Sequence, residues 1–536
     1  MTIPAPDPKS VTGKPLVIDE TVDVLVVGGG PAGLAAAIGA AARGFGVMLV
    51  DENPVSFTTM GDEVPLHFGQ GMAANARNRN AMMEAFVASE PRIAEVFEAG
   101  VDVRLATACW GLYANGPALG WMPGLVAGLA DEERGLLVRA RHVILACGRR
   151  DMGLGFPGWE KPGVMGATAA LSLAVRYGAL GPRQVVVLGS GTDALLTALA
   201  LRETGVAIAA IVEQAPEAIG DPALLATLRE GGAEVLSRHV VREAVGRDGV
   251  EAALVAGLDE AGKPLGEERA IACDGIVLAV GATPVIDLLD AAGCKVAFQG
   301  DRGGFAPVLD RHQRSSVANV YAIGDCAGIW TAKTRDRAVC EAEAERAVAA
   351  LGTLPAEDQA PPAPAPECDI SEYRLAWVRA SVIEARAGFH VCQCEEVSAR
   401  EILEVRPPRY LDWRDERRND RSLAALLGDG PPNPDQVKRL TRAGMGACQG
   451  RRCREQVAAL LALASARPLS AIALAGYRAP TRPLSLAMTA QAPEAPAQSE
   501  HWDTWFGMPA QWRPFWEAPA LYTVATNDAA GPAASE

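Results

Sequence analysis

The sequence has no excess of basic residues, and this absence narrows the class of protein. Its 536 residues include 50 Lys and Arg against 65 Asp and Glu, for a net charge of -15 and a pI near 5.1. Nucleic acid is therefore not expected as a main partner, because phosphate binding needs a basic surface. A chain of this length exceeds one hydrophobic core, so about two to four domains are expected.

Signals for export, for a membrane anchor and for a disulfide framework are also lacking. Residues 1–17 contain neither the basic nor the apolar region of a secretory signal. The charge-free residues 24–42 are interrupted by glycines and a proline, as a strand–turn–helix would be, so no transmembrane segment is expected. The 11 cysteines are an odd number, and several are isolated in apolar strands. Reduced thiols in a cytoplasmic protein are the expectation.

What the chain does contain is an imperfect internal repeat. Residues 22–27 are an apolar run that enters Gly-x-Gly-x-x-Gly at 28–33, and residues 184–188 enter Gly-x-Gly-x-x-Ala at 189–194. Each turn is followed by an Ala-rich stretch of helical length and a second strand that ends in an acidic residue. Two βαβ units with parallel sheets are the economical interpretation, which places the chain in the α/β class.

The first turn predicts a dinucleotide site. In this motif the first glycine makes the turn, the second lets a pyrophosphate approach, and the third lets the helix pack on the strand. Asp51 lies eighteen residues beyond Gly33, where a carboxylate accepts hydrogen bonds from ribose hydroxyls. A plain structural corner is the alternative, but strand, glycines, helix, second strand and acid all occur in order.

The second turn is a weaker signal. Ala194 replaces the third glycine, and Glu213 ends the following strand. Because Glu213 would repel a 2'-phosphate, NAD or another adenine nucleotide is expected there rather than NADP. A domain kept for its fold, without a ligand, is the alternative.

A third motif is residues 319–327, a strand that ends in Gly-Asp. With the glycine-rich turns, it resembles the two-dinucleotide-binding-domain flavoproteins, the disulfide-reductase-like FAD enzymes, over about two-thirds of the chain. The resemblance implies FAD on the N-terminal unit, with Asp325 at the ribityl and pyrophosphate region. The residues implied to bind FAD are Gly28, Gly30, Pro31, Ala32, Gly33, Asp51, Glu52, Gly148, Gly324 and Asp325. Those implied for a second nucleotide are Gly189, Gly191, Ala194 and Glu213.

Disulfide reductases also need a paired redox-active cysteine motif beside the flavin. No such pair occurs before residue 392. The disulfide-reductase reaction is therefore not expected, despite the resemblance in fold.

Four cysteines in the last third of the chain form two closely spaced pairs, Cys392 with Cys394 and Cys448 with Cys453. Residues 398–401 predict a capping box that starts a helix, residues 433–436 start another, and a third is expected from Arg451 onwards. A helical module that presents cysteines from two loops can hold [2Fe–2S], with a structural zinc or bare thiols as alternatives. Zinc ribbons usually pair C-x2-C with C-x2-C, and neither pair here has that spacing.

The sequences at 391–397 and 441–453 resemble the bacterioferritin-associated-ferredoxin-like [2Fe–2S] domain. Fused behind this type of flavoprotein, it resembles the α (A) subunit of heteromeric opine, D-hydroxyproline and amine dehydrogenases and of hydrogen cyanide synthase. The resemblance implies a flavoprotein β subunit that oxidises a C–N bond of an amino acid, imino acid, opine or glycine. It leaves room for an FMN at a subunit interface and for a small third subunit.

Two departures from that pattern stand out. A charged, Pro-rich insertion around residues 406–434 lengthens the interval between the cysteine pairs. The Gly-Gly-Gln usual after the acid is replaced by a later Gly-Gln-Gly at 69–71, near His67, a histidine that merits testing. The six histidines otherwise form no ligand spacing.

A Trp-rich end, with Trp502, Trp505, Trp512 and Trp516, either docks on a partner or packs back on the chain.

The motifs and the resemblance together predict an electron-transfer subunit with FAD and [2Fe–2S] in a multi-subunit dehydrogenase. The sequence nominates no general base, so the catalytic residues are unknown. A self-contained NAD(P)H:acceptor reductase and a non-enzymatic redox or iron-sensing scaffold are the alternatives. The expected domains are a flexible leader at 1–20, an FAD-binding domain at 21–160 and 291–355, an inserted NAD-like domain at 161–290, a linker at 356–380, a cluster domain at 385–475 and a tail at 476–536.

Overall fold

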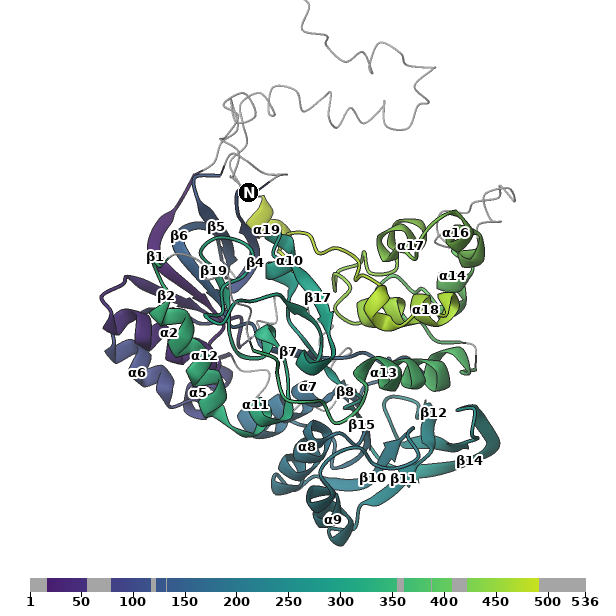
Figure 1. The fold of residues 1–536 in the computed structure, drawn as a ribbon. Helices are drawn as coiled ribbons and strands as arrows, with labels where there is room; N and C mark the ends of the chain where they lie inside the picture. Colours follow the sequence, from purple (N-terminus) through teal and green to yellow (C-terminus); the bar gives the residue numbers. More distant parts are fainter. Residues whose placement is uncertain are drawn as a thin grey trace, which may run out of the picture.

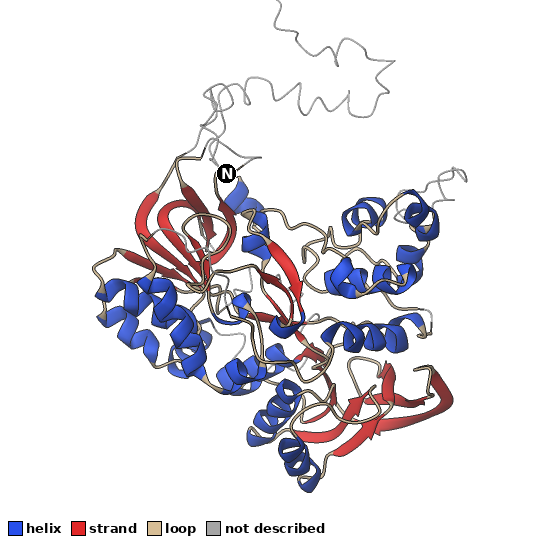
Figure 2. Cartoon of the chain, viewed as in Figure 1, coloured by secondary structure: helices blue, strands red, loops and turns tan. Residues whose placement is uncertain are grey.

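The computed structural model describes residues 17–54, 79–116, 122–131, 133–353, 361–386, 388–406 and 422–490. The leader up to residue 16, His67 with the Gly-Gln-Gly at 69–71, most of the insertion after residue 406 and the Trp-rich end lie outside these ranges. Two α/β units and a helical module are arranged side by side, with most strands in the two units (Figures 1 and 2). No helix in the described ranges is long and apolar enough to cross a membrane.

The first unit is built on a sheet in the order β3-β2-β1-β6-β5-β4, with β19 paired to β6. Its strands are β1 (Glu20–Val27), β2 (Val47–Val50), β3 (Asp102–Arg104), β4 (Ala108–Tyr113), β5 (Leu125–Ala130), β6 (Gly135–Leu145) and β19 (Val320–Ala322). β1 is parallel to β2 and β6, and β19 is parallel to β6. The carboxyl ends of these four strands therefore meet at one edge of the sheet.

Both faces of the second half of β1, residues 24–27, are buried, which explains the apolar run there. Val24 and Val26 face a core formed with helices, whereas Leu25 and Val27 face a second core that includes β4 and β5. The helices on the first face are α2 (Pro31–Ala42), α5 (Arg79–Ser89), α6 (Arg92–Glu98) and α12 (Arg337–Ala349). They gather below and to the left of the sheet in Figure 1.

The second unit repeats this plan with the strand order β11-β10-β9-β15-β8. Its strands are β8 (Val164–Gly166), β9 (Gln184–Leu188), β10 (Ala207–Glu213), β11 (Glu234–Ser237) and β15 (Gly275–Leu278). Its helices are α7 (Ala167–Leu171), α8 (Thr192–Glu203) and α9 (Pro222–Glu230). An antiparallel sheet packs beside it, formed by β12 (His239–Val245), β13 (Ala252–Leu258) and β14 (Pro264–Ala272).

The chain crosses between the two units twice, at an antiparallel pair formed by β7 (Arg149–Asp151) and β16 (Ala282–Pro284). After the second crossing it returns to the first unit. The elements of this return are α10 (Asp287–Ala291), β17 (Val296–Gln299), β18 (Gly304–Pro307), β19 and α11 (Thr331–Arg335). The second unit is thus inserted into the sequence of the first, as in the disulfide-reductase-like fold that the sequence predicts.

The helical module follows, and its core is continuous with that of the second unit. Its helices are α13 (Ile370–Val378), α14 (Ala399–Leu403), α16 (Leu423–Asp429), α17 (Pro434–Thr441) and α18 (Arg454–Ser465). Buried residues of α18 and α13 belong to the same apolar cluster as residues of β9 and β10. The chain then runs back to the first unit and ends its described part at α19 (Leu486–Thr489) (Figure 1).

The predicted helix starts in this module are confirmed at two places. Ser398 and Glu401 form a reciprocal capping box, and Asn433 caps α17 with Pro434 in its first turn. The third helix begins later than predicted. α18 starts at Arg454, with Cys453 as its N-terminal flanking residue rather than in its first turn.

Candidate functional site

The first glycine-rich turn joins β1 to α2 and leaves room for a phosphate. A Cβ on Gly28 would lie 2.2 Å from the carbonyl oxygen of Ala146, and a Cβ on Gly33 would lie 1.9 Å from the carbonyl oxygen of Gly28. A Cβ on Gly30 would meet nothing within 4 Å. Pro31 occupies the first helical position. The outer glycines thus allow close backbone packing, and the middle glycine faces open space at the start of α2, which fits a pyrophosphate.

The two acidic residues after β2 have different surroundings. The Asp51 carboxylate accepts hydrogen bonds from the backbone N–H of Gly29 at 2.5 Å and of Asn53 at 2.7 Å. Burial raises the pKa of Asp51. Glu52 instead pairs with Arg482, whose Nε lies 2.6 Å from Oε2 of Glu52. Asp51 therefore braces the glycine turn, whereas Glu52 binds a segment from the far end of the chain.

Gly148 and the Gly-Asp motif lie at the same edge of the sheet. Gly148 and Gly324 have φ values of +74° and +66°, in the left-handed region that favours glycine. A Cβ on Gly324 would lie 3.0 Å from the Cβ of Ala32, in the first turn of α2. Oδ2 of Asp325 accepts a hydrogen bond from Nε of Arg149 at 2.6 Å. The structure thus brings both glycines and Asp325 next to the first turn, and Asp325 is ion-paired with Arg149.

A buried ion pair supports this motif, and sequence patterns did not single it out. Nζ of Lys333 lies 2.8 Å from Oε1 of Glu343, and both side chains are nearly inaccessible to solvent. Lys333 also donates to the carbonyl oxygen of Gly324, and Glu343 accepts from its N–H. The pair therefore holds the backbone of the Gly-Asp turn at Gly324. Neither residue belongs to a recognisable sequence motif.

The second turn has the same backbone shape but different neighbours. Gly189 has a φ of +99°, and a Cβ there would lie 2.5 Å from the carbonyl oxygen of Ala279. Ala194 is buried in α8. Glu213 is fully buried at the end of β10, and Glu367 lies at Gly191. The four predicted residues of this turn lie together, with side chains of the chain itself around them.

The four cysteines of the helical module converge from two loops. The Sγ atoms of Cys392 and Cys394 are 4.0 Å apart, and those of Cys394 and Cys448 are 3.5 Å apart. Cys453 is buried beside Cys392, and both thiols face Gly444, whose N–H donates to Sγ of Cys392 at 3.4 Å. In a tetrahedral thiolate site, sulfur atoms lie about 3.8 Å apart. Within the described ranges, however, no group of three or more His, Cys, Asp or Glu side chains is arranged to hold one metal ion.

Arginines lie beside these thiols. Nε of Arg451 donates to the carbonyl oxygen of Cys448 at 3.0 Å, and Arg452 donates to the side chain of Gln393. Interaction with Cys394 and burial raise the pKa of the Cys448 thiol well above its ordinary value. The loop would accept deprotonated sulfur atoms most readily when a metal is bound to them.

The segment that follows the module ties it to the first unit. Besides Glu52, Arg482 pairs with Asp287 at 3.0 Å, and Arg150 pairs with Asp287 at 2.7 Å. Burial alone would raise the pKa of Asp287, but these two arginines hold it well below its usual range. The N–H of Thr481 donates to a main-chain carbonyl of β4 at 2.7 Å. The cysteine loops and the first glycine turn therefore belong to one connected body.

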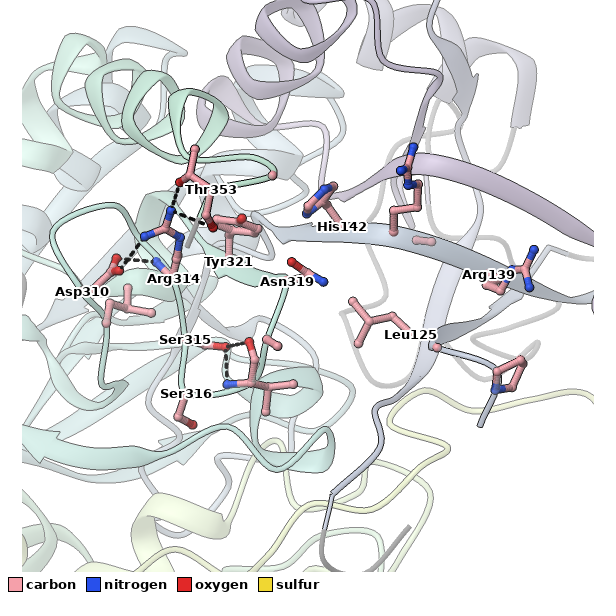
Figure 3. A pocket seen from close by; sticks show the side chains of 18 of the residues that line it. Leu125, Arg139, His142, Asp310, Arg314, Ser315, Ser316, Asn319, Tyr321 and Thr353 are labelled. Atoms are coloured by element: carbon pink, nitrogen blue, oxygen red, sulfur yellow. Dashed lines mark hydrogen bonds and ion pairs between the residues drawn. The ribbon is translucent and has the colours of Figure 1, made fainter. Parts of the chain in front are cut away.

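A cavity of about 990 Å³ lies elsewhere, beside the amino ends of β1 and β19 and the middle of β6 (Figure 3). His142, Arg314 and Tyr321 line it, and burial lowers the pKa of His142. In sheets of this kind, nucleotides bind at the carboxyl ends of the strands, so this cavity is not the nucleotide crevice.

Fold and site together define a protein with two α/β units of the dinucleotide-binding type. Residues 22–351 match the family described as pyridine nucleotide-disulphide oxidoreductase, which is more than half of the chain, and the chain belongs to this family. Residues 420–492 match the domain described as the sarcosine oxidase A3 domain. The predicted fold class and the prediction of an FAD-dependent oxidoreductase are both confirmed.

Similar proteins agree with the predicted resemblance. The chain is 29% identical to the opine oxidase A subunit of Agrobacterium tumefaciens (strain Ach5), over 89% of this chain and 93% of that protein. It is 28% identical to hydrogen cyanide synthase subunit HcnB of Pseudomonas aeruginosa, over 80% of this chain and 90% of that protein. The crystal structure of L-proline dehydrogenase from P. horikoshii has a TM-score of 0.56 at 20% identity, over 89% of this chain and 81% of that one, which shows a shared fold.

Proposed function

We propose that this chain is the electron-transfer subunit of a multi-subunit dehydrogenase that oxidises a C–N bond of an amino acid, imino acid, opine or glycine-like compound. The observation that carries the proposal is the convergence of four cysteines in a module fixed to an FAD-type unit. The similarity to two proteins named as enzyme subunits supports a heteromeric complex. The partners in this proposal are a flavoprotein β subunit, which carries the substrate chemistry, and a small third subunit.

In this proposal residues 21–160 and 291–355 hold FAD, which supplies electron acceptance when bound. The open space at Gly30 and the start of α2 receive the pyrophosphate. Asp51 keeps the turn in shape, and Asp325, held by Arg149, faces the same edge of the sheet. An FMN at a subunit interface is a further element of the proposal.

The module at 385–475 would hold a [2Fe–2S] cluster, which supplies one-electron transfer when bound. Cys392, Cys394, Cys448 and Cys453 are the proposed ligands. The N–H of Gly444 and the guanidinium groups of Arg451 and Arg452 would offset the negative charge of the thiolates. A cytoplasmic setting, in which thiols are kept reduced, is part of this proposal.

Metal and flavin content of the natively purified protein tests this proposal. We expect about two iron atoms and matching acid-labile sulfide per chain, with bound FAD and an electron paramagnetic resonance signal after reduction. A Cys448→Ser/Cys453→Ser variant should lose the iron and the signal but keep FAD. Cys273→Ser, at a buried thiol outside the module, is the matched control and should keep all three. One zinc per chain without sulfide, or no flavin, would refute the proposal.

A further inference from the structure

The two glycine-rich turns of this chain can be compared position by position. In both, the acid at the end of the second strand accepts a hydrogen bond from the N–H that follows the first glycine. This N–H belongs to Gly29 for Asp51 and to Ser190 for Glu213. In both, the acid also accepts a hydrogen bond from the backbone N–H two residues further along the chain. This donor is Asn53 for Asp51 and Ala215 for Glu213. The backbones of the two crevices are therefore built alike. They differ in the side chains that lie beside the middle glycine and beside the acid.

The first difference lies at the middle glycine. A Cβ on Gly30 would meet nothing within 4 Å, whereas a Cβ on Gly191 would lie 3.5 Å from a carboxylate oxygen of Glu367. Glu367 comes from the segment that precedes α13, and its Oε2 accepts a hydrogen bond from the N–H of Thr192 at 2.9 Å. Thr192 is the first residue of α8. A carboxylate of the chain thus takes the place at the helix N-terminus where a nucleotide phosphate would bind.

The second difference lies at the acid. Oε2 of Glu213 accepts a hydrogen bond from the phenol of Tyr373 at 2.8 Å and from Oγ of Ser190 at 2.6 Å. A ribose hydroxyl would donate to the acid at this position in a working dinucleotide site. Glu213 is completely shielded from solvent, and burial raises its pKa. The Tyr373 hydroxyl therefore stands where the ribose hydroxyl would.

The element that carries Tyr373 is a built part of the molecule. α13 lies between the second unit and the cysteine module (Figure 1). Trp377 has no exposed surface and Arg374 is 4% exposed, and Arg374 donates to the carbonyl oxygens of Ala282 and Gly303. Glu367 is exposed, so its contact with Thr192 lies at the outer edge of the second crevice. The contact of Tyr373 with Glu213 lies in the buried part of the crevice.

We infer that the second nucleotide crevice is closed by the chain itself, with Glu367 and Tyr373 in place of the phosphate and ribose of a dinucleotide. Pyridine nucleotide then neither binds at Gly189–Ala194 nor delivers electrons to the flavin. These two residues set the specificity of the chain against pyridine nucleotide, although it belongs to a family named for it. This inference does not depend on the cysteine site or on the identity of the substrate.

Binding of NAD⁺ and ADP to the purified, flavin-loaded protein tests this inference by calorimetry. Wild type should show no binding of either probe at about 1 mM, and anaerobic NADH should leave the flavin oxidised. Because removal of a tethered occupant raises apparent affinity, Glu367→Ala/Tyr373→Ala should bind at least about tenfold more tightly than wild type. Glu372→Ala, at an exposed carboxylate on α13, is the matched control and should behave as wild type.

The single variant Glu367→Ala keeps the buried part intact and should show a smaller gain in affinity with an unchanged melting temperature. It guards against failure of the double variant to fold, which flavin content and thermal melting would reveal. Tight NAD⁺ binding or rapid flavin reduction by NADH in wild type would overturn the inference. The inference would also be overturned if the folded double variant bound NAD⁺ and ADP no more tightly than wild type. If the double variant does not fold, the same result for Glu367→Ala would overturn it.

Discussion

At the residue scale, two glycines of the first turn, Gly33 and Gly30, have separable roles. Gly33 lies against backbone, so the fold itself forbids a side chain there. Gly30 faces open space, so a methyl group there meets no part of the protein. Steric contact within the chain accounts for Gly33, whereas the space beside Gly30 fits the proposed pyrophosphate.

Alanine substitutions separate these two roles. Gly33→Ala should destabilise the protein by on the order of 3 kcal/mol, because its Cβ would overlap the carbonyl oxygen of Gly28. Gly30→Ala should melt within a few degrees of the flavin-free wild type but retain much less FAD after purification. Thermal melting and flavin absorbance measure both effects. Equal FAD retention in Gly30→Ala and wild type would contradict a pyrophosphate at this turn.

A second residue-scale prediction concerns Asp151, at the crossing between the units. Burial raises the pKa of Asp151 to about 6, and Thr168 donates two hydrogen bonds to its carboxylate. The unfolded chain has a pKa near 3.9, so the folded state holds the proton more tightly. Stability should therefore fall by about 3 kcal/mol as pH rises from about 4 to about 6.

Melting curves across this pH range check the prediction. Asp151→Asn should remove this part of the pH dependence, because the amide carries no ionisable proton. Asp248→Asn, at an exposed loop, is the control and should keep it. An unchanged pH profile in Asp151→Asn would show that burial does not perturb this carboxylate.

At the element scale, the segment after the cysteine module holds the molecule together by a few buried charges. Arg482 reaches both Glu52 and the buried Asp287. Loss of Arg482 would take one of the two arginines from Asp287 and the paired guanidinium from Glu52. Loss of charge from a buried network costs more than loss of a surface pair.

Arg482→Ala should therefore lower the free energy of unfolding by on the order of 3 kcal/mol. It should also increase hydrogen exchange in residues 473–485. Arg141→Ala, which removes an exposed pair with Asp23, should cost less than about 1 kcal/mol. Urea unfolding compares the two. Equal costs would mean that Arg482 is a surface contact and does not fasten the module.

Local patterns in the sequence explain what could be predicted. Apolar runs, glycine turns and caps are short-range signals, and they locate β1, α2, β9 and α8 and two helix starts in the module. The contacts that define the second crevice are long-range. Tyr373 lies 160 residues from Glu213, and Glu367 lies 175 residues from Thr192. No local pattern marks either one, so the sequence suggested a nucleotide where the structure places the chain's own side chains.

The two cysteine pairs could be recognised in the sequence because the members of each pair are local neighbours. Each pair of cysteines is close in sequence, and the flanking capping signals place it in a loop. The meeting of the two pairs, by contrast, depends on helix packing across 54 residues. The role of Arg482 was also hidden, because it lies 430 residues from Glu52.

At the scale of the whole molecule, the two α/β units and the cysteine module are connected by buried contacts in the described parts of the chain. The first unit presents an open nucleotide turn, the second unit presents a closed one, and the cysteine module is fastened to both. Such an arrangement suits a chain that receives electrons from a partner protein, since its own pyridine-nucleotide entrance is filled.

The most direct test is anaerobic reduction of the natively purified complex, followed by electron paramagnetic resonance. An amino-acid or opine substrate of the complex should produce the signal of a reduced [2Fe–2S] cluster, and NADH at the same concentration should produce none. The Cys448→Ser/Cys453→Ser complex should oxidise substrate at its flavin without that signal. A cluster signal driven by NADH, or substrate reduction of flavin with no iron–sulfur signal in the wild-type complex, would contradict the account.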